Sequence, residues 1–214
     1  MRPTGARAKE RLGSPLFVAI MLPKDKDDLL ALLAKHAYSF KPGGFVLVSG
    51  QVSDEYLECR MALSQPEALP VLGRVFLSQV DPRAVAVGGL TMGADPVAIA
   101  TSAASAGLRP IRWFSVRKDA KAHGKKKLIE GDVTPGNGVV IVDDVVTTGG
   151  STILAIQSCR EYGLQIVQVI VLVDREQDGG LQKVKDVAGE DVQVTAIFTK
   201  REVRAAWQQR QQAL

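Results

Sequence analysis

Cysteine is scarce in this sequence, which contains Cys59 and Cys159 and no other thiol among its 214 residues. Neither cysteine has neighbours at metal-ligand spacing, so we expect no disulfide framework and a reducing, cytoplasmic compartment. Long apolar runs are lacking too. The run between Pro15 and Pro23 is too short to cross a bilayer as a helix. The sequence therefore predicts a globular protein without a membrane span.

A strong net charge is also absent, because 27 basic and 23 acidic residues give a formal charge of +4. This balance does not favour a nucleic-acid-binding protein. The basic residues are nevertheless concentrated between positions 112 and 127, which indicates an anionic partner or, alternatively, a solvated basic loop. The stretch contains Arg112, Arg117, Lys118, Lys121, Lys125, Lys126 and Lys127.

The chain length suits one α/β domain with a small appendage. We expect an N-terminal extension over residues 1–22, a helix and hood region over 23–83, a core over 84–200 and a C-terminal helix over 201–214. The extension has a basic start and then an apolar run. It weakly resembles a signal peptide, but it lacks a small-residue cleavage site. An alternative is that Met21 is the natural start.

The region before residue 84 does not alternate regularly between strands and helices. Leucines at helical spacing predict a helix that starts at Pro23. Residues 45–48 read as a short strand with 56–61 as its hairpin partner, and a second helix is expected over 66–79. We expect this region to form a flap over the carboxyl edge of the sheet, where open α/β sheets bind ligands.

From residue 84 onward, apolar strands alternate with helices. This order predicts a parallel sheet with right-handed crossovers and helices on both faces, a Rossmann-like α/β fold. Residues 117–138 show little apolar periodicity. The expected strands are 84–87, 110–116, 139–142, 165–173 and 192–198, and the expected helices are 96–105, 151–162 and 201–211.

Residues 139–152, VVIVDDVVTTGGST, carry the clearest chemical pattern. Asp143 and Asp144 follow a buried strand, where paired carboxylates are costly unless they are solvated or face a cation or hydroxyl groups. The Thr-Thr-Gly-Gly-Ser run that follows offers hydroxyls, close backbone approach and free N–H groups at a helix start, all suited to phosphate. The segment therefore suits a ribose 5-phosphate. The alternative is an ordinary glycine-rich turn with Ser151 or Thr148 as helix cap. No Walker loop or dinucleotide fingerprint occurs.

This segment resembles the phosphoribosyl-diphosphate (PRPP) motif of type I phosphoribosyltransferases. The resemblance implies that family's fold, with a small N-terminal hood on the core. It also implies that the acid pair holds the ribose hydroxyls and that the following residues hold PRPP. The residues that it assigns to PRPP here are Asp143, Asp144, Val145, Val146, Thr147, Thr148, Gly149, Gly150 and Ser151.

The stretch RKDAKAHG at 117–124 places four basic side chains within seven residues. Cations that close over a leaving pyrophosphate would stabilise its developing charge and exclude water. The stretch resembles the catalytic loop of orotate phosphoribosyltransferases, which crosses a homodimer interface in that family. The resemblance makes Lys118, Lys121 and His123 catalytic with the acid pair, and adds a partner subunit's Arg117 to the PRPP contacts.

Three shorter matches agree with this family. Phe45–Gly50 with Ser53 and Tyr56 resembles its N-terminal signature, and residues 88–96 resemble its pyrophosphate-side turn. Arg175, at a strand end, resembles its orotate-binding arginine, with Thr147 as a second orotate contact. A guanidinium pairs bidentately with a carboxylate, which orotate carries. Val48 and Met92 depart from the pattern, because many members have lysines there.

The resemblance implies the reaction of orotate with PRPP to give orotidine 5′-monophosphate and pyrophosphate, a step of pyrimidine (UMP) biosynthesis. It also implies Mg²⁺ held mainly by PRPP rather than by the protein, and a homodimer. Two alternatives remain open. One is a regulator that binds PRPP without turnover, and the other is a phosphoribosyltransferase for another base. The cationic loop disfavours the first, and Arg175 disfavours the second.

Overall fold

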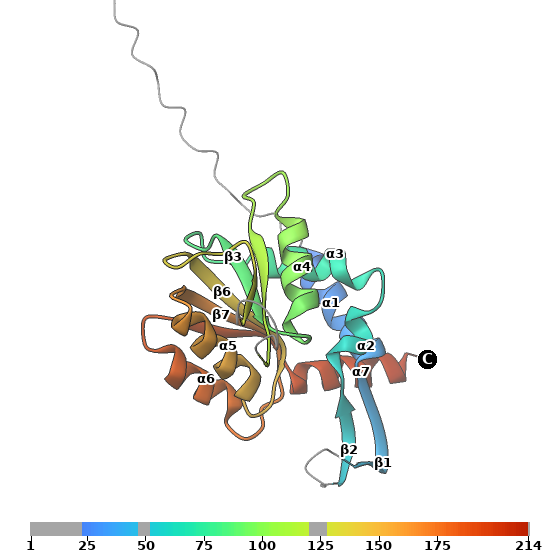
Figure 1. The fold of residues 1–214 in the computed structure, drawn as a ribbon. Helices are drawn as coiled ribbons and strands as arrows, with labels where there is room; N and C mark the ends of the chain where they lie inside the picture. Colours follow the sequence, from blue (N-terminus) through green and yellow to red (C-terminus); the bar gives the residue numbers. More distant parts are fainter. Residues whose placement is uncertain (1–22, 47–51, 120–127, 214) are drawn as a thin grey trace, which may run out of the picture.

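A six-stranded sheet forms the centre of the molecule (Figure 1) in the computed structural model, which describes residues 23–46, 52–119 and 128–213. The strand order is β5-β4-β3-β6-β7-β8. All neighbours are parallel except the short edge strand β5, which is antiparallel to β4. The strands are β3 (Ala86–Leu90), β4 (Arg112–Val116), β5 (Ile129–Gly131), β6 (Gly138–Val146), β7 (Gln165–Asp174) and β8 (Gln193–Thr199). The predicted α/β fold with a mainly parallel sheet is confirmed.

Helices cover both faces of this sheet because its strands are apolar at successive positions. Alternate residues point to opposite faces of a strand. On β6, Val140 and Val142 pack with α1 (Pro23–His36), α3 (Ala68–Leu77) and α4 (Ala94–Ala104). Val139 and Ile141, one position earlier in each case, pack with α5 (Gly150–Glu161) and α6 (Gly180–Ala188). The sheet therefore lies between two hydrophobic cores.

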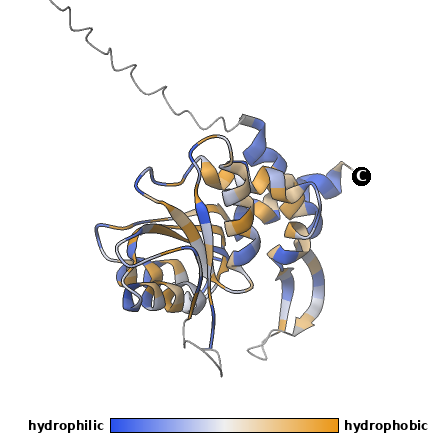
Figure 2. Cartoon of the chain, turned by 45° about the horizontal axis from the view of Figure 1, so that its top comes forward, coloured by the Kyte–Doolittle hydropathy of each residue, from blue (hydrophilic) through white to orange (hydrophobic). Residues whose placement is uncertain are grey.

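The helices are apolar on the side that faces the sheet and polar on the other. Figure 2 shows the hydrophobic colour on the strands and on the helices beside them, and the hydrophilic colour on the last turns before the C-terminus. The C-terminal helix α7 (Lys200–Gln212) buries Val203 and exposes most of its other residues. A Thr199–Glu202 capping box starts this helix. Across the described residues, no helix combines the length and apolarity that a bilayer crossing requires.

The hood consists of the hairpin β1 (Tyr38–Val46) and β2 (Val52–Leu57), followed by the short helix α2 (Cys59–Leu63). The base of the hairpin lies against α7 (Figure 1), where the Tyr38 and Trp207 rings pack at a tilt, with 5.4 Å between their centroids. Glu55 joins the two elements through Lys200 at 2.9 Å and Arg204 at 2.8 Å. Leu57, at the base of the hairpin, accepts a hydrogen bond from Arg175 at the carboxyl end of β7, and the rest of the hairpin extends away from the sheet (Figure 1).

Several predicted boundaries were wrong. The predicted strand over 56–61 ends at Leu57, because Glu58 accepts a hydrogen bond from the Arg60 N–H and caps α2. β5 lies within 117–138, where its three residues are too few for a visible period. α6 was not predicted between two strands. Strand β6 continues to Val146, so the acid pair lies inside a strand rather than after one.

Candidate functional site

A pocket of about 310 Å³ opens at the carboxyl ends of β3, β6 and β7. This is the edge at which open parallel sheets bind ligands. The pocket is polar and collects residues from five separate parts of the chain. Its lining residues are Glu58, Arg60, Leu90, Thr91, Met92, Gly93, Lys118, Asp143, Asp144, Val145, Val146, Thr147, Thr148, Gly149, Gly150, Ser151, Thr152 and Arg175.

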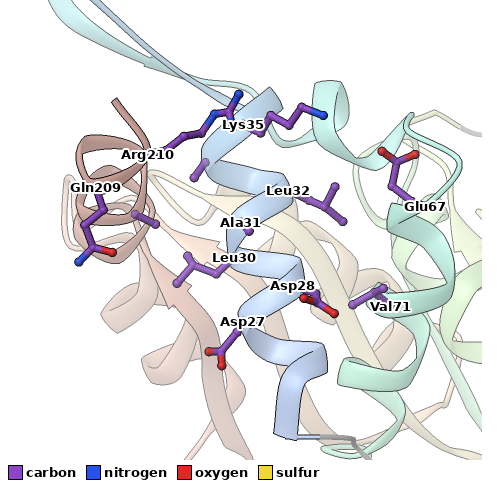
Figure 3. A pocket seen from close by; sticks show the side chains of 12 residues that line it. Asp27, Asp28, Leu30, Ala31, Leu32, Lys35, Glu67, Val71, Gln209 and Arg210 are labelled. Atoms are coloured by element: carbon purple, nitrogen blue, oxygen red, sulfur yellow. The ribbon is translucent and has the colours of Figure 1, made fainter. Parts of the chain in front are cut away.

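A larger groove of about 820 Å³ lies between α1, α3 and α7. Figure 3 shows Leu30, Ala31 and Leu32 of α1 along this groove, with Arg210 of α7 on one side and Val71 of α3 on the other. None of the predicted site residues lines it. We therefore assign the chemistry to the smaller pocket, where carboxylates, backbone donors and cations converge.

The acid pair forms one wall of the pocket. Asp143 and Asp144 are 3% and 6% exposed. Thr152, in the first turn of α5, donates its hydroxyl hydrogen bond to Asp143 Oδ2 at 2.7 Å. The backbone N–H of Asp144 donates to Asp143 Oδ1 at 3.1 Å. The Asp143 carboxylate is therefore held through both of its oxygens, and both aspartates line the pocket.

Burial sets the protonation of this pair. Desolvation, reinforced by the charge of Asp144, raises the pKa of Asp143 to about 7. Desolvation also raises the pKa of Asp144. Two neighbouring carboxylates in a dry site share protons unless a cation or hydroxyl donors stabilise their charge. The wall is accordingly suited to a ligand that brings hydroxyl groups and a positive centre.

The turn between β6 and α5 supplies donors for an anion. Gly149 has φ of +85° and precedes α5 without a side-chain cap of its own. The Gly150 N–H makes only a 3.5 Å contact with Thr148 Oγ1, so the first turn of the helix keeps N–H donors for an anion. Gly180 at the start of α6 lies directly beneath this turn, where an added Cβ would overlap the backbone oxygen of Thr147. The turn thus depends on two glycines. Gly149 permits its backbone conformation, and Gly180 permits its close contact with α6.

The predicted pyrophosphate-side turn lies opposite this loop. Thr91 and Ser115 donate to the two oxygens of Asp95 at 2.5 and 2.6 Å, which ties the turn to β4. A Cβ at Gly93 would lie 2.6 Å from Asp144 Oδ1. The backbone of the turn is therefore in contact with the acid pair. Met92 is 65% exposed and offers no charge.

Arg175 lines the pocket as predicted, and Thr147 lies on the same wall. The Arg175 Nη2 group donates to the backbone oxygen of Leu57, at the base of the hood hairpin. Its Nε is buried and has no hydrogen-bond partner within the described part of the chain. The guanidinium thus joins the hood to the sheet edge and keeps donors for a ligand.

The basic loop is described only at its start. Lys118 lines the pocket. Arg117 does not; it lies 3.7 Å from Glu130 and donates to the backbone oxygen of Asp119. Lys121 and His123 lie outside the described residues, as does Val48. The predicted roles of these residues stay predictions.

Sequence reasoning missed two residues of the pocket, Glu58 and Arg60. They were assigned to a strand, in which they would have had no special relation to each other. The acid at position 58, two residues before an arginine at the start of a helix, was the available signal for a cap with an ion pair.

Comparisons with known proteins agree with this geometry. The family model described as a phosphoribosyl transferase domain matches residues 84–205. An orotate phosphoribosyltransferase of Synechocystis is 40% identical over 184 residues, which are 85% of this chain and 90% of the relative.

Two solved structures of Mycobacterium tuberculosis orotate phosphoribosyltransferase are also similar. The complex with Fe(III) dicitrate has a TM-score of 0.73 and 34% identity, and covers 84% of this chain and 98% of its own. The complex with PRPP has a TM-score of 0.66 and 29% identity, over 86% and 93%.

Proposed function

The chain belongs to the phosphoribosyltransferase family, and within it to the orotate phosphoribosyltransferases, and from this premise we propose that its pocket transfers ribose 5-phosphate from PRPP to orotate. The products are orotidine 5′-monophosphate and pyrophosphate. One observation carries the proposal. An acid pair, a helix-start anion loop and Arg175 converge in a single pocket.

The positions of the groups give each part of PRPP a place. The first-turn N–H groups of α5 and the hydroxyls of Thr147, Thr148 and Ser151 bind the 5′-phosphate. Asp143 and Asp144 accept hydrogen bonds from the ribose hydroxyls. Arg175 pairs with the carboxylate of orotate, with Thr147 beside the base. These assignments bring the orotate nitrogen and C1′ of the ribose together over β6.

The chemical step then needs positioning and charge stabilisation rather than a protein nucleophile. The bond between C1′ and the diphosphate oxygen breaks and its electron pair leaves with pyrophosphate. The orotate nitrogen forms the new bond to C1′ and gives up its proton to the departing pyrophosphate or to water. The carboxylates of the acid pair favour the positive charge that develops on the ribose. Lys118, Lys121 and His123 stabilise the negative charge on the departing pyrophosphate.

Mg²⁺ fits this pocket as a companion of PRPP. The two buried carboxylates with raised pKa values form an environment that gains from added positive charge. Among the residues that the structure describes, no group of three or more His, Cys, Asp or Glu side chains could hold a metal ion alone. As the resemblance implies, the diphosphate and ribose oxygens would supply most of the ligands, and the ion would neutralise diphosphate charge.

A homodimer in the cytoplasm completes the proposal. The loop that begins at Arg117 leaves the sheet beside the pocket, and the resemblance assigns some of its residues to the neighbouring subunit. Mixing Lys121→Ala with Asp144→Asn tests this sharing. If the loop acts across the interface, hybrid dimers regain one intact site and about a quarter of wild-type activity. Activity no higher than the sum of the separate variants would place the loop in its own subunit's site.

The activity itself is tested by following the loss of orotate absorbance with PRPP and Mg²⁺. We expect turnover with orotate and none with adenine or uracil as acceptor. Turnover with a purine but not with orotate would overturn the acceptor. Binding of PRPP without any turnover would support a regulatory protein instead.

A further inference from the structure

Arg60 is held in one orientation by Glu58. Its Nε donates to Glu58 Oε1 at 2.8 Å and its Nη2 to Oε2 at 3.0 Å. Glu58 is itself fixed, because it caps α2. The guanidinium has five N–H donors, and this pairing uses one edge. No described residue accepts a hydrogen bond from its Nη1. The N–H donors on the other edge of the Arg60 guanidinium thus remain available for an anion.

The second observation is where this edge lies. Glu58 and Arg60 line the same pocket as the acid pair and the turn at 91–93. The charges of Arg60 and Asp144 are close enough to interact. Gly93 contacts the same Asp144 carboxylate from the other side. Arg60 and the predicted pyrophosphate-side turn therefore line the same pocket, and both lie near the Asp144 carboxylate.

A matched pair elsewhere shows that the geometry alone does not imply a function. Arg83 pairs with Asp81 over the same sequence spacing, with Nε at 3.0 Å and Nη2 at 2.8 Å from the two carboxylate oxygens. That pair lies before β3, at the amino end of the strand and outside the pocket. What distinguishes Arg60 is that it lines the candidate ligand pocket, whereas Arg83 does not.

On the premise of the proposed function, we propose that Arg60, oriented by Glu58, binds the diphosphate of PRPP and stabilises it as the leaving group. The other anionic groups of the substrates have their own partners: the α5 start holds the 5′-phosphate, and Arg175 holds the orotate carboxylate. The turn at 91–93 offers backbone groups and no cation. Arg60 supplies the fixed positive charge on that side, and a fork of N–H donors matches phosphate oxygens.

Titration calorimetry with inorganic pyrophosphate and Mg²⁺ tests the contact without requiring turnover. Arg60→Gln should weaken pyrophosphate binding about tenfold to hundredfold, as loss of a hydrogen-bonded charge does. The KM for PRPP should rise with it, and the KM for orotate should stay within about twofold. Arg60→Lys should recover only part of the affinity, because an ammonium lacks the fork.

Two further variants separate binding from orientation. Glu58→Gln keeps an acceptor oxygen for the helix cap but loses the charged anchor, so it should weaken pyrophosphate binding less than Arg60→Gln does. Arg83→Gln removes the matched pair outside the pocket and should leave the affinity unchanged. Thermal unfolding of each variant confirms that the fold is retained.

The outcomes separate this inference from the proposed function. Unchanged pyrophosphate affinity in Arg60→Gln, with wild-type turnover of orotate intact, overturns the role of Arg60 alone. A rise confined to the KM for orotate would also overturn it, since Arg60 would then serve the acceptor. Weakened pyrophosphate binding in a protein that never consumes orotate would support the contact and refute the proposed activity.

Discussion

The pocket has two parts that arise in different ways, a continuous segment of the chain and a set of cationic residues from separate elements. The segment from β6 into α5 (residues 138–161) is continuous, and it carries the acid pair and the phosphate loop within nine residues, 143–151. The cationic wall (Arg60, Lys118 and Arg175) comes from α2, from the end of β4 and from the end of β7. The first part depends on local backbone geometry and the second on tertiary packing.

The largest expected effect is in the basic loop at 117–124. Lys121→Ala should lower kcat about 10²–10³-fold, because a cation that acts on the leaving group contributes mainly in the transition state. Steady-state kinetics with varied PRPP measures this, and the affinity for PRPP should change much less. Lys183→Ala, on the exposed side of α6, is the control. An unchanged kcat in Lys121→Ala would remove the loop from the mechanism.

The continuous segment should also prove sensitive to one distant residue. Gly180→Ala places a methyl group against the Thr147 backbone and must displace the phosphate loop. Misplacement of this kind costs up to about 10²-fold in kcat/KM for PRPP. The exposed Gln182→Ala on the same helix should have no effect. Normal kinetics in Gly180→Ala would show that α6 does not support the loop.

The third prediction concerns Arg175, the residue of the cationic wall that we assign to orotate. Arg175→Gln should raise the KM for orotate about tenfold, because the carboxylate loses a charge-assisted pair. The KM for PRPP should change little. Arg201→Gln, which breaks a nearby exposed ion pair with Glu176, is the matched control. Equal losses for both substrates in Arg175→Gln would indicate a structural role at Leu57 instead.

The smallest effect concerns stability and pH. The pKa of Asp143 lies at about 7 in the folded protein, above its value of about 4 in an unfolded chain. The folded state therefore holds a proton that the unfolded state releases, and stability falls as pH rises between these values. Between pH 4 and pH 8, the free energy of unfolding of Asp143→Asn should decrease by about 1–2 kcal/mol less than that of wild type. Urea unfolding at each pH measures it.

A control of opposite sign is available for this comparison. The Arg83 side chain lowers the pKa of Asp81, so the stability that Asp81 contributes is lost only as the pH falls below the usual carboxyl range. Asp81→Asn should thus keep the wild-type slope between pH 5 and pH 8. Parallel curves for wild type and Asp143→Asn would contradict the raised pKa.

The same division explains what could be predicted from sequence. Residues 143–151 could be grouped from the sequence because strand, turn and helix follow one another along the chain, and all nine line the pocket. Arg175 was placed by its position at a strand end. Arg60 was missed, since a strand was expected where Glu58 starts a helix. Its relation to Asp144 arises only when the hood packs on the sheet edge, and no local pattern records that contact.

The central claim is that the continuous segment binds the ribose 5-phosphate part of PRPP, while the cationic wall binds its diphosphate. A crystal structure with PRPP and Mg²⁺ tests this claim most directly. The account predicts the 5′-phosphate at the start of α5, the ribose hydroxyls on Asp143 and Asp144, and the diphosphate beside the turn at 91–93 within reach of Arg60. A 5′-phosphate bound at the cationic wall, with the diphosphate at α5, would contradict it.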